Sequence, residues 1–368
     1  MYQYDNRTVI TLDAGGTNFV FGAMQANEFV VEPITLPSQS ADLDLCLAQL
    51  IKGFEMVIKK LKTIPVAISF AFPGPADYEQ GIIGGYLPNF PSFRDGVALG
   101  AFLRNRFNIP VFINNDGDLF AYGEALAGKL VEINERVLSL GGSKRFKSLI
   151  GYTFGTGLGV GHVYDNLLHL GDNSCIETFC LRHKHDQNII VEEGVSVRAI
   201  KRVYAEESGV LDVSLEPKDI FDIAEGSREG NAEAARRAFE HLGQVAGDAM
   251  ATATSLLDGI VVIGGGITTA KKYIMPALLK EMRSSIFTLS GDEVRRVQPK
   301  VYNLDDDDEF RYFALGNSRQ LKVYGSNQYV SYDEQKRIGV AISTIGAPKA
   351  ISLGAYNYAL SQLDKIKS

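Results

Sequence analysis

The stretch "TVITLDAGGTNFVFGAM", residues 8–24, carries the clearest fold signal of the chain. Two apolar, β-rich runs flank a glycine pair, and this order of strand, tight turn and strand predicts a β-hairpin. The same order returns in "IGYTFGTGLGVGHVYDN", residues 150–166. A repeat at a spacing of about 140 residues is far too long for a solenoid, so it predicts a duplicated architecture with a cleft between two halves.

Around these hairpins, the spacing of apolar residues predicts helices that alternate with short buried strands. Strands are expected at 65–72, 109–115 and 259–264, and further short strands at 320–343. The expected helices cover 41–62, 97–107, 191–206, 218–225, 230–257, 271–283 and the closing segment 349–363. We expect the acidic run 305–309 on a solvated loop, with a metal site as the alternative.

This alternation indicates an α/β fold, and the chain length of 368 residues indicates two domains. Single cores rarely grow past roughly 250 to 300 residues. We expect residues 1–114 to form a smaller N-terminal α/β domain together with the C-terminal helix 355–368. Residues 115–354 are expected to form a larger α/β domain that carries the ligand sites.

Composition excludes several classes of protein. The net charge of −7 argues against a broad nucleic-acid surface. The chain has no run of about 18 apolar residues, and its N-terminus lacks the basic start and apolar stretch of a signal peptide. The three cysteines are few and irregularly spaced, which suits reduced thiols. We therefore expect a cytoplasmic protein with no nucleic-acid and no membrane partner.

Two glycine-rich turns have the chemistry of an anion site. Asp13 ends an apolar run and is followed by Gly15, Gly16 and Thr17, so backbone amides and a hydroxyl are available to a phosphate. An ordinary hairpin turn is the alternative. "GTGLGVG" (155–161) repeats the device in the second half, and because it leads into a strand it does not fit a Rossmann fingerprint.

A third glycine cluster, in "VVIGGGIT" (261–268), stands between a buried strand and a helix. The missing side chains would let a planar base lie against the backbone, and a tight turn before the helix is the alternative. Together, "LDAGGTN", "GTGLGVG" and "VIGGGI" resemble the phosphate-1, phosphate-2 and adenosine segments of the actin-like ATPase superfamily. With "FPGPAD", "NNDGDLFAYGE" and the closing "AISLGAYNYAL", they resemble the ROK family of sugar kinases and repressors in the family's own order.

The resemblance implies a two-domain actin-like ATPase fold, related to ribonuclease H, and ATP-dependent phosphorylation of a sugar with Mg²⁺. It makes Asp116 the general base and Asn115 a sugar ligand. A sugar hydroxyl is a poor nucleophile, so an aspartate at a strand end can orient it and accept its proton. Asn114 and Asp118 are expected to be turn and cap residues.

The resemblance also assigns the other site residues. The expected ligands of the sugar, besides Asn115 and Asp116, are Gly74, Asn89, Glu177 and Glu192. Without the family, Glu177 and Glu192 would both be interpreted as solvated surface charges. Glu193 competes with Glu192 for its role. The nucleotide residues are expected to be Asp13, which positions Mg²⁺ through water, Gly15, Gly16 and Thr17, Gly155, Thr156 and Gly157 for the phosphates, and Gly264, Gly265 and Gly266 for adenosine.

The chain departs from the family at its zinc site. "ETFC" places Cys180 where the family has a zinc-binding histidine, and the CxCGxxGC knuckle is absent. Cys175, Cys180, His183 and His185 are awkwardly spaced for a tetrahedral site, so zinc is not expected. The sugar remains open among glucose, fructose, mannose and N-acetylated hexosamines.

Two rivals to a kinase remain. Sugar-sensing repressors of the family carry a helix-turn-helix before the first glycine turn, and only twelve residues precede Asp13 here. A catalytically weak sugar-binding protein is the other, although both Asp13 and Asp116 are present. We further expect a homodimer.

Overall fold

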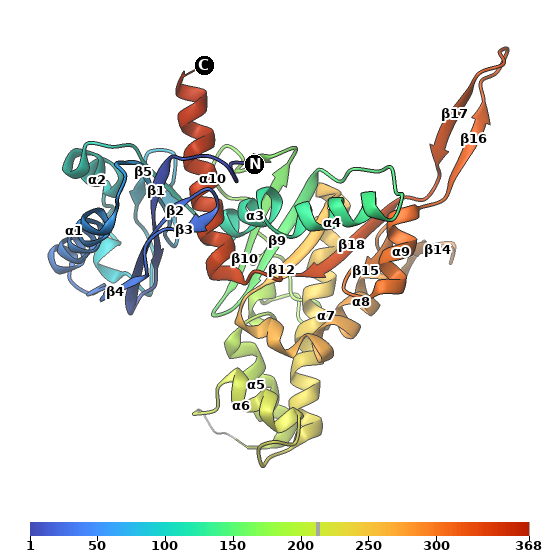
Figure 1. The fold of residues 1–368 in the computed structure, drawn as a ribbon. Coiled ribbons are helices and arrows are strands. Elements are labelled where there is room, and N and C mark those ends of the chain that lie inside the picture. The colour runs from blue at the N-terminus through green and yellow to red at the C-terminus, as the bar shows by residue number, and fades with distance from the viewer. Residues whose placement is uncertain (211–213, 368) are drawn as a thin grey trace. The chain divides into compact units, whose positions relative to one another are not determined.

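The computed structural model describes residues 1–210 and 214–367, which form two compact units (Figure 1). The first unit contains Met1–Val131, Gly161–Ile176 and the chain from Ile345 onward, and the second contains Glu132–Val160 and Glu177–Thr344. These boundaries differ from the expected division at residue 114. The reason is that helix α3 (Asp116–Leu126) packs against α10 (Ala347–Lys367) and so joins the first unit.

The first unit is built on the predicted hairpin. Strands β1 (Thr8–Ala14) and β2 (Asn18–Gln25) pair antiparallel, and β5 (Pro65–Ala71) and β8 (Val111–Asn114) continue the sheet parallel to β1. The order is β3-β2-β1-β5-β8, with β4 (Ile34–Pro37) also paired to β2. The remaining strands among residues 1–131 are short: β3 (Glu28–Phe29), β6 (Ala76–Asp77) and β7 (Ile82–Ile83). Strand β11 (Leu167–Leu168) instead pairs with β10 (Leu158–Tyr164) at the edge of the other six-stranded sheet.

Two helices beside this sheet form where the sequence predicts them. The 3.6-residue apolar spacing of α1 (Leu43–Lys60) buries Leu50, Phe54 and Val57 among other residues, and Asp42 caps its N-terminus by accepting a hydrogen bond from the Leu45 amide. The second helix, α2 (Leu99–Phe107), ends at Asn108, which adopts the left-handed conformation. The two helices border a core rich in phenylalanine, and that core fixes the sheet beneath the site.

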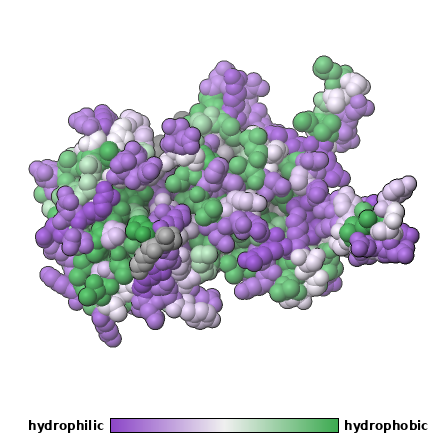
Figure 2. All heavy atoms as spheres, turned by 90° about the horizontal axis from the view of Figure 1, so that it is seen from above, coloured by the Kyte–Doolittle hydropathy of each residue, from purple (hydrophilic) through white to green (hydrophobic). Residues whose placement is uncertain are grey.

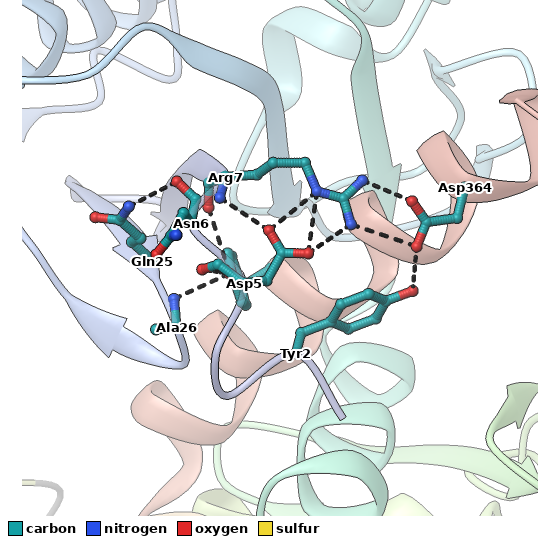
Figure 3. Close-up of polar contacts among 8 residues, drawn as sticks. Tyr2, Asp5, Asn6, Arg7, Gln25, Ala26 and Asp364 are labelled. Carbon is teal, nitrogen blue, oxygen red and sulfur yellow. Dashed lines mark hydrogen bonds and ion pairs between the residues drawn. The ribbon is translucent and has the colours of Figure 1, made fainter.

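The chain termini of the first unit are tied together by a polar cluster (Figure 3). The Arg7 guanidinium donates to the Asp5 carboxylate, with its Nη2 2.6 Å from Oδ2, and its Nη1 donates to Asp364 of α10 at 2.6 Å. Tyr2 Oη donates to the other oxygen of Asp364 at 2.9 Å. The hydrogen bonds from Arg7 lower the pKa of Asp5. The cluster holds the segment before β1 against α10.

The second unit repeats the topology of the first. Strands β9 (Ser148–Phe154) and β10 (Leu158–Tyr164) are neighbours on either side of the second glycine turn, and β12 (Ile260–Gly264) and β18 (Arg337–Ile342) continue the sheet. Strands β9, β12, β18 and β15 (Lys300–Asn303) are parallel. The duplication predicted from the two hairpins is confirmed, whereas the cleft between halves stays a prediction.

Most helices of the second half also form as predicted, with two exceptions. The helix expected at 191–206 begins at Val197, because Ser196 caps it, and Val191–Glu193 form a separate 3-10 turn, η2. The acidic run is exposed as expected, but it starts a helix rather than a loop. The helices are α4 (Lys129–Ser139), α5 (Val197–Ser208), α6 (Pro217–Ala224), α7 (Ala232–Leu257), α8 (Lys271–Met282) and α9 (Asp307–Leu315).

Two hairpins of the second unit stand apart from its main sheet. These are β13 (Ser285–Phe287) with β14 (Glu293–Arg295), and β16 (Ser318–Lys322) with β17 (Tyr329–Asp333).

Figure 2 shows hydrophilic and hydrophobic residues interspersed over the visible face of the molecule. Within the described part of the chain, no helix combines the length and apolar character needed to cross a membrane.

Candidate active site

The carboxyl ends of three parallel strands bring the predicted residues of the first unit together. Asp13 of β1 lies opposite Ala71 of β5, and Ala71 lies opposite Asn114 of β8. The residues that follow Asn114 therefore stand at the same sheet edge as Asp13. The two carboxylates interact electrostatically. Desolvation is the main cause that raises the pKa of Asp116, and the charge of Asp13 adds to the rise.

Asp116 begins helix α3 directly after β8. Its side chain is solvent-accessible, yet enough protein surrounds it that desolvation raises the pKa of its carboxyl, and the Gly117 amide, which donates to Oδ1 at 2.8 Å, opposes that rise. A carboxylate that is raised in pKa and still reachable is suited to accept a proton. The geometry is therefore compatible with a general base at this position.

The residues on either side of Asp116 correct one expectation. Asn115 is the helix cap, because its Oδ1 accepts the Gly117 amide at 2.7 Å, whereas Asn114 and Asp118 were expected to provide the turn and the cap. Asn114 ends β8 and is buried, and neither polar atom of its side chain has a partner within the described residues. Asp118 is 7% exposed in the first turn of α3. Local spacing does not distinguish four adjacent polar residues, because burial decides between them.

Two serines stabilise the first glycine turn by hydrogen bonds, and the sequence pattern does not indicate either of them. The Ser40 hydroxyl donates to the Gly16 carbonyl at 3.0 Å, and the Ser38 hydroxyl donates to the same oxygen. The Gly15 amide donates to Asn18 O at 3.0 Å. No hydrogen bond within residues 1–210 and 214–367 takes up the amides of Gly16 and Thr17. Two donors are therefore available to an anion.

Asn89 and Gly74 lie on loops near this sheet edge. A Cβ at Gly16 would lie only 2.8 Å from Asn89 Cβ, so Asn89 packs against the turn. Gly74 follows β5, where a Cβ would lie 3.0 Å from Tyr78 Oη, and that hydroxyl donates to Phe72 O at 2.9 Å. The first unit thus gathers all of its predicted site residues around the ends of β1, β5 and β8.

The second unit holds an equivalent arrangement of its own. Gly264 pairs with Thr153 at the ends of β12 and β9, and Gly265 has a φ of +98°. A Cβ at Gly265 would overlap the carbonyl of Phe154, so only glycine permits this close approach. The third glycine cluster and the strand that leads into the second glycine turn are therefore in direct contact.

The second glycine turn presents donors in the same way as the first. The Gly155 amide donates to Gly157 O at 3.1 Å, and the Val197 amide of α5 donates to Gly155 O at 2.9 Å. No partner within the described chain takes up the amides of Thr156 and Gly157. A Cβ at Gly155 would meet nothing within 4 Å, so the turn faces open space.

Glu192, rather than Glu193, contacts this turn. Its Oε2 accepts the Leu158 amide at 3.0 Å, and its Oε1 accepts Arg198 Nη2 at 2.7 Å. The Glu193 carboxylate accepts Nε and Nη2 of the same arginine at 3.0 and 2.7 Å. Glu177 is half-buried and begins the second chain segment of the second unit. The sequence pattern did not indicate Arg198, because Glu192 and Glu193 precede the helix and are not at helical spacing from it, and Thr156 lies in a distant turn.

The expectations for zinc and Mg²⁺ concern the His, Cys, Asp and Glu side chains. Within the described residues, no group of three or more His, Cys, Asp or Glu side chains is placed to hold a metal ion. His183, His185 and His241 lie 5.2 to 5.8 Å apart by ring centroids, but His183 Nδ1 already accepts the amides of His185 and Asp186. The absence of zinc stays a prediction. The Asp13 carboxylate forms no hydrogen bond or ion pair within the described chain, so it fits a water-mediated contact to Mg²⁺.

Comparison with known proteins finds related sequences and structures. A model of the ROK family matches residues 9–306. The chain is 53% identical to a glucokinase from Parabacteroides distasonis, with 98% of this chain and 99% of that chain covered and a TM-score of 0.88. A ROK family glucokinase from Streptomyces griseus, solved in complex with glucose and AMPPNP, shares the fold at 17% identity, with 95% of this chain and 98% of that chain covered and a TM-score of 0.61.

The match to a curated relative covers a much shorter stretch of sequence. The xylose repressor of Bacillus spizizenii is 31% identical over 106 residues, which are 29% of this chain and 23% of the repressor. The chain therefore spans less than a quarter of that relative.

Proposed function

Because the chain belongs to the ROK family, we propose that it is an ATP-dependent kinase that phosphorylates a hydroxyl group of a hexose. The observation that carries the proposal is the sheet edge of the first unit, where the reachable, raised-pKa carboxyl of Asp116 stands beside Asp13 and an anion-binding turn. The 53% identity to a glucokinase makes glucose the first candidate sugar. Fructose, mannose and N-acetylated hexosamines are the alternatives.

In the proposed reaction, the deprotonated Asp116 accepts the proton of the attacking sugar hydroxyl as that oxygen bonds to the γ-phosphorus and the bond to the leaving ADP oxygen breaks. Asn115 orients the same hydroxyl, and its position as helix cap fixes its side chain. The ring of the sugar would be held by the remaining predicted ligands, Gly74, Asn89, Glu177 and Glu192.

The nucleotide would use the free amides described above. Gly16 and Thr17, with Gly15, offer donors from the first unit, and Thr156 and Gly157, with Gly155, offer donors from the second. Gly264, Gly265 and Gly266 would lie against adenosine. Asp13 would hold Mg²⁺ through water, and the ion would neutralise phosphate charge.

A homodimer remains a prediction that light scattering can test.

The test is a coupled assay of ADP release over a panel of hexoses, with wild type and Asp116→Asn. The variant keeps the size of the side chain but removes the proton acceptor, so kcat should fall by roughly 10²- to 10⁴-fold with a much smaller change in KM. Asp44→Asn is the matched control, because it removes the same charge from the first turn of α1. Sugar binding without turnover by the wild type would instead favour a catalytically weak sugar-binding protein.

A further inference from the structure

The second glycine turn carries an electrostatic problem for an anionic ligand. Glu192 accepts the amide of Leu158, the residue directly after the turn, and a Cβ at Gly157 would come within 2.6 Å of its Oε2. Glu193 lies next to it in sequence and shares its arginine partner. A carboxylate so close to free amides, with a second one beside it, would repel a phosphate unless a positive charge compensates them.

Arg198 is the cation that meets both glutamates. It stands at the second position of α5, and its side chain reaches Glu192 and Glu193 at 2.7 Å each. Its Nη1 also donates to the carbonyl of Thr156, inside the turn, at 3.4 Å. The hydrogen bonds from Arg198 lower the pKa of Glu193, which keeps that carboxyl ionised. The guanidinium is therefore placed between the two acids and the turn.

We infer that Arg198 is a positioning residue that makes the Gly155–Gly157 turn acceptable to a nucleotide phosphate, by offsetting one of the two negative charges of Glu192 and Glu193 and by holding Glu192 in place. The inference rests on the proposed function, since it takes the turn to bind ATP. It assigns Arg198 no contact with the phosphate itself. The ligand class is a polyphosphate anion, and the residue acts on its affinity through charge.

The experiment compares KM for ATP at saturating sugar in wild type, Arg198→Gln, Glu193→Gln and the double variant. Arg198→Gln leaves two uncompensated carboxylates near the phosphates, so KM for ATP should rise by about tenfold. The rise should shrink as salt is added, because ions screen the exposed charges. Glu193→Gln in the Arg198→Gln background removes one of the two charges and should recover most of the loss.

Arg202→Gln is the matched control. Arg202 lies one turn further along α5, donates to the Glu193 carbonyl and pairs with Glu206, so it should leave KM for ATP within about twofold. An unchanged KM for ATP in Arg198→Gln would overturn the inference. So would a tenfold rise that neither salt nor Glu193→Gln relieves, because that result indicates direct contact with the phosphate or a structural role.

The inference can fail independently of the proposed function. If the wild type phosphorylates none of the hexoses, the kinase proposal fails, and calorimetric titration with AMPPNP then reports on the turn directly. Weaker AMPPNP binding by Arg198→Gln, recovered by Glu193→Gln, would still support the role of Arg198. Equal binding by wild type and Arg198→Gln would contradict it.

Discussion

An alanine at Gly123 or Gly354 tests the contact that brings α3, and with it Asp116, into the first unit. A Cβ at Gly123 would overlap the carbonyl oxygen of Ala350 in α10 and lie 2.8 Å from the carbonyl carbon. A Cβ at Gly354 would overlap the Leu119 oxygen in α3 and lie 2.7 Å from its carbon. Because both neighbours are backbone atoms, the helices themselves must separate to admit the methyl group.

The magnitude follows from that separation. The overlapping carbonyl oxygen lies closer than the carbon and sets the displacement, so the helices must move apart by about 1 Å or more, which forfeits roughly half of the dispersion attraction along the contact. Overpacking costs about 1–3 kcal/mol, and a rigid backbone neighbour places Gly123→Ala at the upper end. Alanine returns about 1 kcal/mol of helix propensity. The expected net loss is about 2 kcal/mol, or a fall in unfolding midpoint of about 4–8 °C for a unit of about 170 residues.

Thermal unfolding followed by circular dichroism measures this for Gly123→Ala, Gly354→Ala and the double variant. The double variant should lose less than the sum, because helices that have already separated accommodate the second methyl group more easily. Ser352→Ala, on the same helix, is the control, since its hydroxyl bonds only the Pro348 carbonyl in its own helix. Its midpoint should change by no more than about 2 °C.

The same variants report on the site, because α3 starts at the proposed base. A displacement of about 1 Å near reacting groups can cost up to about 10²-fold, so the kcat/KM of Gly123→Ala should fall even where the protein is fully folded. An unchanged or raised unfolding midpoint for Gly123→Ala would refute the reasoning, because it would mean that helix propensity outweighs the close approach.

Three further outcomes are expected. Asp13→Ala should lower kcat/KM by about 10²-fold or more, while sugar affinity measured by calorimetry stays within a few fold, because the residue is assigned to the metal; an equal loss of sugar affinity would contradict that placement. Burial lowers the pKa of His241 to about 4, so the unfolded state binds more protons below pH 6.5, and the free energy of unfolding should fall by about 1–2 kcal/mol from pH 7 to pH 5; His241→Gln should flatten this dependence in chemical denaturation, and an equally steep profile would exclude His241 as its source. Protein purified without a histidine tag should contain no stoichiometric zinc by elemental analysis, and about one zinc per chain would reverse the reading of the cysteines and histidines.

Much of the fold is predictable because local pattern and tertiary structure agree. The two hairpins, α1 and α7 follow from apolar spacing alone, and each forms within two residues of its expected ends. The acidic run was misjudged because net charge was given more weight than capping. Asp306 accepts the Glu309 amide at 2.9 Å, and this aspartate-to-glutamate spacing of three residues is the sequence signature of a helix start.

The order of the parallel strands predicts which residues of the site lie together, and the remaining contacts of the site are not predictable in this way. Residues that directly follow β1, β5 and β8 reach one edge because parallel strands end together, so Asp13 and Asp116 could be paired from sequence. The burial of Asp118 and the bond from Arg198 to Glu192 could not, because each depends on how neighbouring segments pack. The cap could not either, because several adjacent residues of this stretch are equally suited to it and the structure selects Asn115. Such contacts join residues that share no periodic pattern.

The two glycine turns show how one backbone device acquires two electrostatic characters. Each turn leaves a pair of amides free, but the first is backed by the neutral hydroxyls of Ser38 and Ser40, whereas the second is backed by Glu192 and Arg198. The side chains that support the first turn from Ser38 and Ser40 are neutral, so substituting Ser38 changes no charge there. At the second turn the potential depends on a balance of exposed charges, which salt and single substitutions can shift. Arg198→Gln should therefore change how nucleotide affinity depends on salt, whereas Ser38→Ala should leave that dependence unchanged.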